Sequence, residues 1–312
     1  MVMVCAVGFS ASRCNAWNST GHELVAQVAY DQLSPATRLA IVTMLREHPR
    51  LHEDLLHDDI RANDDNLAIF LRAATWPDFV RFPAHPMTHA ENHPTWHYVD
   101  LPFETEGAKG PQPDLHWDGK SDPANLVQAM DKALAQLKNP ATAKDRKAID
   151  VCWVEHLVGD IHQPLHATSW FSNEFPDGDR GGNSVEIRTG TNQLVNLHYY
   201  WDSLEGMSMD PEQIRKMADR IEAEHPTAEF KDQMKDLSSP DWMRESYELS
   251  KNVVYLNGAL PHSTKDISTT NPSAVPPLPA GYEKQALATA DTRVALAGYR
   301  LAEMLNEIAK WQ

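Results

Sequence analysis

Apolar residues recur at intervals of three and four along much of this 312-residue chain, a spacing that brings them onto one face of a helix. In one short stretch, such a face is made of Leu126, Met130, Ala133 and Leu137. A longer stretch predicts a final helix over about 282–310, with a buried stripe of Leu287, Val294, Leu301, Leu305 and Ile308. We therefore expect a mainly α fold.

Prolines and capping residues indicate where individual helices begin and end. The pairs at 34–35 (Ser-Pro) and 122–123 (Asp-Pro) each place a capping side chain before a proline suited to the first helical turn, so a helix should begin at each. Another helix should run over about 144–161, because Pro164 cannot continue it.

Strand signal is confined to two short segments, 184–187 and 193–197, on either side of Gly190. They predict one small β-hairpin. The segment 261–280, rich in Pro, Ser and Thr, should form a long surface loop. The chain shows no internal repeat, so one domain is expected.

The first sixteen residues differ from the rest of the chain. An apolar run, Val2–Phe9, is followed by small residues up to Ala16, which predicts a secretory leader in residues 1–16 and a mature domain over 17–312. The usual basic residues before the run are absent, so the true start could also lie upstream. Two of the three cysteines fall in the leader, leaving Cys152 as a buried apolar residue and no possible intramolecular disulfide. Export to the medium or to a bacterial periplasm is expected.

The formal net charge of -16 argues against binding nucleic acid through a broad basic surface. A cluster of divalent cations could still attract a polyanion locally. No stretch approaches the ~18 to 20 apolar residues that a membrane span requires.

The most informative motif is His156-Leu-Val-Gly-Asp160-Ile-His-Gln-Pro-Leu-His166. His156 and Asp160 are four residues apart and share a helix face, which suits one metal ion, while His166 follows the proline and can serve a second ion. Alone, this segment would fit a core histidine beside a surface carboxylate. The same His-x3-Asp spacing recurs in His198 and Asp202, beside the predicted hairpin.

Three further segments add imidazole or carboxylate groups: Thr75-Trp-Pro-Asp78, Trp96-His97-Tyr-Val-Asp100 and Trp17-Asn-Ser-Thr-Gly-His22. Taken in chain order, these separated motifs closely resemble the zinc-dependent single-strand-specific nuclease family of the S-one and P-one type. That family shares its fold with bacterial zinc phospholipase C. The resemblance runs from Trp17 to Asp202 and implies a single-domain, mainly α fold.

Carried over residue by residue, the resemblance implies three Zn²⁺ ions. One would be held by Asp78, His97, His156 and Asp160. A second would be held by Trp17, through its α-amine and carbonyl oxygen, and by His22, with Asp160 bridging. The third would be held by His166, His198 and Asp202. Zinc lowers the pKa of bound water toward ~7, which would supply hydroxide to attack phosphorus and leave a 5′-phosphate.

The resemblance also implies how substrate is held. Arg81 would neutralise charge on the phosphate, and Tyr98 and Asp100 would receive a base, one by stacking and one by hydrogen bonds. Asn183 and Asn196 are expected in the phosphate pocket, although a structural turn role is an equal alternative. The expected substrates are single-stranded DNA and RNA and nucleotides, with an accompanying 3′-nucleotidase activity, on a monomer.

Two other functions compete with this hypothesis. A phospholipase C on the same scaffold would be expected to carry glutamate in place of Asp202. A non-catalytic zinc-binding protein would be expected to have closed four-ligand sites, whereas Asp160 is shared here.

Three other histidines, His85, His89 and His93, are expected on surface loops because prolines interrupt their spacing, and His162 is expected to be structural or to support a ligand.

Overall fold

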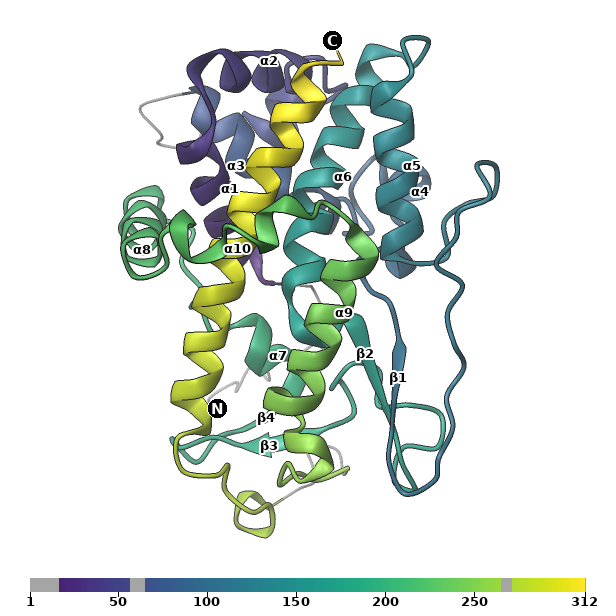
Figure 1. Cartoon of the computed structure of the whole chain (residues 1–312), viewed down its shortest axis with the longest axis vertical. Helices are drawn as coiled ribbons and strands as arrows, with labels where there is room; N and C mark the ends of the chain where they lie inside the picture. Colours follow the sequence, from purple (N-terminus) through teal and green to yellow (C-terminus); the bar gives the residue numbers. More distant parts are fainter. Residues whose placement is uncertain (1–16, 57–64, 265–270, 312) are drawn as a thin grey trace, which may run out of the picture.

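The structure is a computed structural model that describes residues 17–56, 65–264 and 271–311. The predicted leader lies outside the described residues. Helices make up more than half of this part of the chain, and most of the longer ones run side by side along the long axis of the molecule (Figure 1). Their bounds are Ser19–Gln32 for α1, Pro35–Leu45 for α2, Asp65–Phe79 for α3, Leu126–Lys138 for α5, Lys144–His162 for α6, Ser239–Leu249 for α9 and Tyr282–Ala309 for α10.

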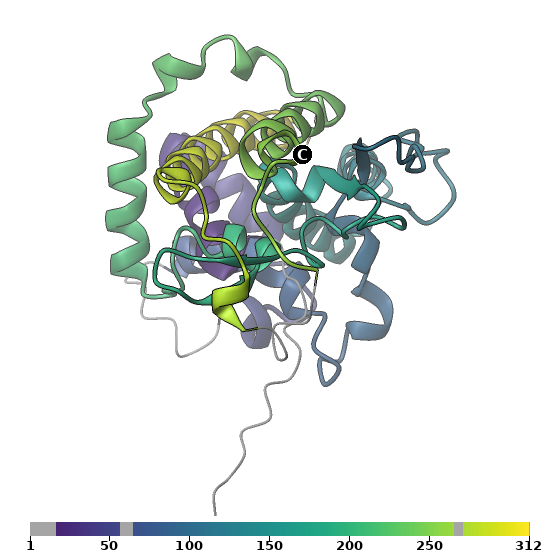
Figure 2. The same ribbon diagram turned by 90° about the horizontal axis from the view of Figure 1, so that it is seen from below.

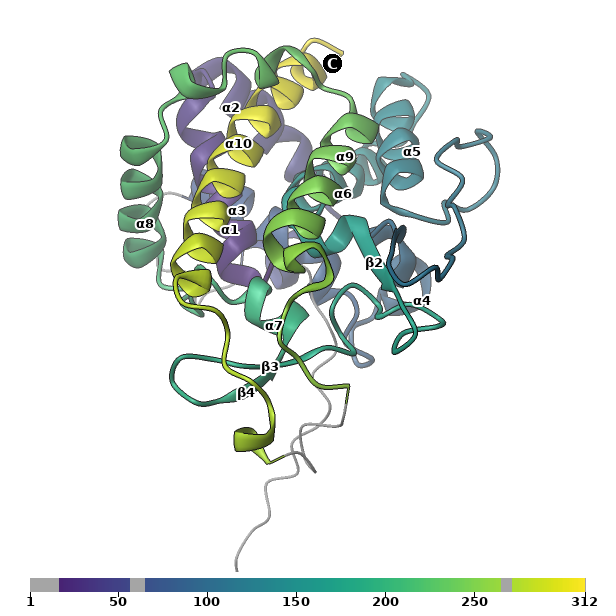
Figure 3. The same cartoon turned by 60° about the horizontal axis from the view of Figure 1, so that its bottom comes forward.

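Shorter elements surround this bundle. Figure 2 shows α8 at its outer edge, and Figure 3 shows α7 with strands β3 and β4 beneath the ends of α6 and α10. The remaining α-helices are α4 (Thr88–Glu91), α7 (Leu197–Asp202) and α8 (Pro211–Glu224). The strands are β1 (Leu101–Glu104), β2 (Thr168–Phe171), β3 (Glu186–Arg188) and β4 (Leu194–Asn196). The mainly α prediction is confirmed.

The predicted helix boundaries hold except at one position. Helix α2 begins with Pro35, and Ser34 accepts a hydrogen bond from the backbone of Thr37 at 3.1 Å. Helix α6 ends two residues before Pro164, as expected. The predicted start at residues 122–123 is wrong, because the cap of α5 is Asn125, whose side chain accepts from the Gln128 backbone at 3.1 Å.

Helix α10 buries four of the five residues predicted for its stripe, and the prediction for Leu287 is wrong. Leu287 is 40% exposed, while the neighbouring Ala286 and Ala290 face the core. A straight helix drifts by about 20° per heptad, so a stripe extrapolated from the far end leaves the buried face. Small residues also let α10 approach α1 closely, since a Cβ on Gly298 would lie 2.5 Å from Cγ1 of Val28.

The predicted hairpin is present, with β3 antiparallel to β4 and Ile187 opposite Val195. A second sheet was not predicted. Strand β1 pairs in parallel with β2, and Leu101 lies opposite Thr168. This pairing joins the segment that follows His97 to the segment that follows His166, so it fixes two predicted ligand loops side by side.

The described part of the segment 261–280 lies against the hairpin. Isolated bridges join Ser263 to Glu186 and Pro277 to Arg188, and the Arg188 side chain donates to the Val275 carbonyl at 2.7 Å. The segment thus covers the outer side of β3. None of the helices within the described residues is long and apolar enough to cross a membrane.

Candidate metal centre

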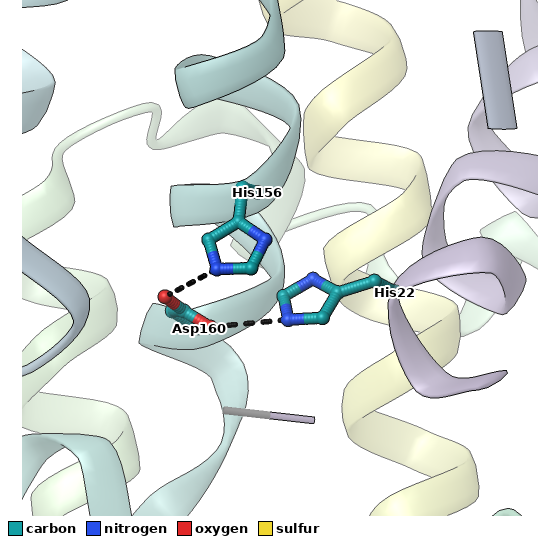
Figure 4. A group of neighbouring side chains, drawn as sticks. All are labelled: His22, His156 and Asp160. Carbon is teal, nitrogen blue, oxygen red and sulfur yellow. Dashed lines mark ion pairs between the residues drawn. The ribbon is translucent and has the colours of Figure 1, made fainter. Parts of the chain in front are cut away.

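The centre is built around Asp160, which lies on α6 and is fully buried. One of its oxygens, Oδ2, lies 3.2 Å from Nε2 of His156, one helical turn earlier. Its other oxygen, Oδ1, lies 3.3 Å from Nε2 of His22, which α1 presents (Figure 4). The two oxygens of a single carboxylate therefore face two different histidines, an arrangement suited to bridging two cations.

A second group shares Asp160 and His156. Nδ1 of His97 lies 3.0 Å from Nε2 of His156 and 3.2 Å from Oδ2 of Asp160. Oδ1 of Asp78, at the end of α3, is 3.8 Å from the same nitrogen of His97. Zinc binds imidazole and carboxylate at ~2.0 to 2.2 Å in a tetrahedron, which puts ligand atoms roughly 3.3 Å apart. The observed separations lie near this value.

The third group consists of His166, His198 and Asp202, whose candidate ligand atoms lie within 4.8 Å of one another. Nε2 of His198 is 3.4 Å from Oδ2 of Asp202 on the next turn of α7. Nδ1 of His166 is 4.0 Å from Oδ1 of Asp160, so this group adjoins the other two. The structure therefore brings together all eight side chains that the sequence analysis assigned to metal.

Backbone carbonyls orient three of the histidines. Nδ1 of His156 lies 2.8 Å from the carbonyl oxygen of Ala74. Nδ1 of His166 lies 2.5 Å from the carbonyl oxygen of His97. Nδ1 of His198 lies 2.6 Å from the carbonyl oxygen of Gly181. A carbonyl can only accept, so Nδ1 carries the proton in each ring and the Nε2 lone pair faces the candidate site. This is the tautomer that binds a cation through Nε2.

Several of these atoms are buried without a hydrogen-bond partner. They are Nε2 of His22, His166 and His198, and Oδ1 of Asp160. Leaving polar groups desolvated and unpaired costs free energy that proteins generally avoid. A divalent cation would satisfy all four atoms at once, so the donor set fits bound metal.

Burial lowers the pKa of four of the five histidines, His22, His97, His166 and His198, and so favours their neutral forms. It lowers the pKa of His22 to about 4 and, together with the neighbouring His166, lowers the pKa of His198 to about 3. For His156, burial is outweighed by the neighbouring Asp160, and the pKa is raised. For Asp160, burial alone would raise the pKa, but its contacts with His156 and the other histidines outweigh burial and hold the pKa well below its usual range. Neutral imidazoles around an ionised carboxylate are the forms that bind metal.

Two glycines leave room for the ligands. A Cβ on Gly159 would lie 2.7 Å from Nδ1 of His22, so any side chain there would displace that ring. Gly181 has a φ of +60°, and its carbonyl holds His198. Gly182 follows with a φ of +85°, so two successive glycines make this turn. Gln163 was not predicted, although it donates to Oδ1 of Asp202 at 2.7 Å.

Trp17 begins the described chain and is completely buried. The backbone N–H of the next residue, Asn18, donates to the Asp202 carbonyl at 3.2 Å. This bond ties the backbone beside Trp17 to α7, which carries two of the candidate ligands. The side chain of Trp17 packs against α1, where a Cβ on Gly21 would lie 2.8 Å from Cβ and 3.1 Å from Cγ of Trp17.

The predicted substrate residues lie beside the centre or in its supporting turns. Nη1 of Arg81 is 3.0 Å from Oδ1 of Asp78. Tyr98 directly follows His97 and is 37% exposed. Desolvation by the surrounding protein raises the pKa of the Asp100 carboxyl. The nearby Arg180, which the sequence analysis did not identify as a site residue, opposes this rise.

The two asparagines have structural hydrogen bonds. The Asn183 side chain donates to the Arg180 carbonyl at 2.8 Å. Oδ1 of Asn196 accepts from the Tyr199 backbone at 2.6 Å and caps α7. The turn role, which the sequence analysis left open, therefore accounts for these contacts.

The histidines outside the centre differ from the prediction in part. His85 is buried rather than on the surface, because its Nε2 lies 3.1 Å from Oδ2 of Asp54. The ring of His93 stacks on Trp96, with centroids 3.7 Å apart. His162 is structural. Its Nδ1 donates to the Val158 carbonyl at 2.8 Å, and its Nε2 accepts from Arg300 at 3.0 Å.

Comparison with known proteins gives a consistent set of relatives. The family model described as S1/P1 Nuclease matches residues 17–310. Endonuclease 2 of Arabidopsis thaliana is 26% identical over 65% of this chain and 60% of its own length, and Nuclease S1 of Aspergillus oryzae is 23% identical over 60% and 53%. Nuclease P1 of Penicillium citrinum is 23% identical over 94% of this chain and 97% of its own length. The chain thus spans little more than half the length of the first two relatives.

Proposed function

This chain belongs to the S1/P1 nuclease family, and on that premise we propose that it is an exported, zinc-dependent phosphodiesterase that cuts single-stranded DNA and RNA to 5′-phosphate products. The single observation that carries the proposal is the position of Asp160. Its two oxygens lie 3.2 and 3.3 Å from histidines of different helices, at the meeting point of three groups of metal-ligating side chains.

The donor set favours zinc. The groups combine neutral imidazole nitrogens with carboxylate oxygens and contain no thiolate, and zinc accepts both donor types. Three Zn²⁺ with the three carboxylates of Asp78, Asp160 and Asp202 give a local charge of 6 - 3 = +3. This local charge would attract a polyanion despite the net charge of -16.

When bound, zinc would supply activated water near neutral pH and offset charge on the phosphate. The chain's own residues would do the positioning. Asp160 would hold two neighbouring ligand groups at a fixed separation. Arg81, anchored through Asp78 at 3.0 Å, would place its guanidinium against the phosphate oxygens. Tyr98, exposed beside His97, would stack on a base, which a duplex keeps covered.

The first prediction concerns strandedness. The protein should cleave a single-stranded oligonucleotide about 5- to 150-fold faster than the same sequence as a duplex, because stacking worth ~1 to 3 kcal/mol is lost when the base is paired. Initial rates with both substrates, with and without a chelator, measure this. Activity should disappear on chelation and return with Zn²⁺.

A phosphatidylcholine substrate serves as the control for the competing phospholipase C activity. Equal cleavage of both strand forms, or release of the lipid head group without cleavage of DNA, would contradict the proposal. The relative rates for RNA and DNA, and for a 3′-mononucleotide, would then define the range of substrates.

A further inference from the structure

Two phenylalanines beside the metal centre are exposed to solvent. Phe79 is 43% exposed and Phe82 is 59% exposed. The other phenylalanines of the described residues are at most 6% exposed, namely Phe70, Phe103, Phe171, Phe175 and Phe230. Exposed apolar rings that gather beside a functional site often mark a binding surface.

This pair is continuous with the centre. Phe79 directly follows Asp78, and Phe82 directly follows Arg81, whose Nη1 lies 3.0 Å from Oδ1 of Asp78. The centroids of the two rings are 6.0 Å apart, with 61° between their planes. The chain therefore places an exposed ring directly after Asp78 and another directly after Arg81, whose guanidinium we assign to phosphate.

The first ring stands on a buried polar network. The rings of His85 and Phe79 pack at 72° to each other with centroids 5.0 Å apart, and Nε2 of His85 lies 3.1 Å from Oδ2 of Asp54. The indole of Trp76 donates to the same oxygen at 2.9 Å. Arg50 pairs with the other oxygen, Oδ1, at 3.1 Å. These contacts hold Phe79 in place from below.

The second ring sits on a turn held by Thr88. Its Oγ1 lies 2.7 Å from the Phe82 carbonyl and 2.8 Å from the carbonyls of Val80 and His85. A fixed, exposed ring loses little conformational entropy when a ligand stacks on it. The turn therefore presents Phe82 ready for a flat ligand.

We propose that Phe82, supported by Phe79, is a second stacking site for a base of the single-stranded substrate, on the other side of the scissile phosphate from the base at Tyr98. The proposal rests on the proposed nuclease function. Tyr98 directly follows His97, and Phe79 directly follows Asp78. These two candidate ligands belong to one metal group, and Nδ1 of His97 lies 3.8 Å from Oδ1 of Asp78. A strand carries a base on each side of every internal phosphate, and aromatic rings stack on any base.

The test pairs a change in the enzyme with a change in the substrate. A short oligothymidylate with one permitted cleavage site is made with a single abasic residue at each position in turn. For the unchanged protein, an abasic residue at the Phe82 position should lower kcat/KM about tenfold, within the range for one lost stacked base. In Phe82→Ala this penalty should vanish, while the penalty at the Tyr98 position remains.

Two further variants separate stacking from other effects. Phe82→Trp should keep the penalty, whereas Phe82→Leu, which stays apolar without a π face, should lose most of it. Leu39→Ala is the matched control, because Leu39 is 64% exposed on α2, at the end of the bundle away from α7 (Figure 1). It should behave as the unchanged protein.

The outcomes distinguish this site from the proposed function. If the unchanged protein cuts single strands but every abasic penalty is the same in Phe82→Ala, the stacking site is refuted and the nuclease function stands. If the unchanged protein cuts no single strand under zinc-replete conditions, the nuclease function is refuted and the stacking site with it.

Discussion

Replacing Asp160 with asparagine should lower kcat/KM on single-stranded DNA by about 10³-fold or more. Removing one group that stabilises transition-state charge costs ~10² to 10³-fold, and Asp160 serves two ligand groups. Asparagine is neutral and offers one acceptor oxygen, so its amide N–H₂ would face either His22 or His156, whose Nε2 atoms lie 3.3 and 3.2 Å from the present carboxylate.

Kinetics and zinc content measured on the same preparation check this prediction. D160N should bind fewer zinc ions than the unchanged protein while keeping its helical circular dichroism. Asp145→Asn is the matched control, since Asp145 is exposed in the first turn of the same helix. Full cleavage activity in D160N with a reduced zinc content would refute the three-zinc mechanism, and an unchanged zinc content would refute the role of Asp160 as a bridging ligand.

The second large effect concerns the N-terminus. Protein that starts at Trp17 should be about 10²-fold or more active than protein carrying residues 1–16, because only a free α-amine has a lone pair for zinc, whereas an amide nitrogen has none to offer. Trp17 is completely buried, and the N–H of Asn18 is bonded to the Asp202 carbonyl, so the backbone there has a fixed position.

A single extra residue makes the sharpest comparison. Protein starting with one glycine before Trp17 keeps the fold and removes the free amine of Trp17. It should show the same loss of activity as the full chain and bind about one zinc fewer. Equal activity and equal zinc content in all three forms would show that the Trp17 amine is not a ligand.

The sequence predicted the parts of the fold that depend on short-range spacing. Helix α6 and the pairs His156 with Asp160 and His198 with Asp202 follow from residues four apart on one helical face. The hairpin of β3 and β4 follows from two neighbouring segments around a glycine turn.

The missed features depend on contacts between distant residues. Strands β1 and β2 have four residues each and are separated along the chain by α5 and α6. No local sequence pattern therefore predicts that they pair in parallel. The burial of His85 depends on Asp54, 31 residues earlier. The bond from Gln163 to Asp202 and the exposed pair of Phe79 and Phe82 likewise become visible only when the helices are packed.

The most direct measurement is the zinc content of protein that starts at Trp17, determined by elemental analysis and followed by chelation and readdition of zinc during cleavage of single-stranded DNA. We expect about three zinc ions per chain, loss of cleavage on chelation and recovery with Zn²⁺. One zinc or none in a folded, active protein, or three zinc ions without cleavage of any phosphodiester, would contradict the three-zinc nuclease.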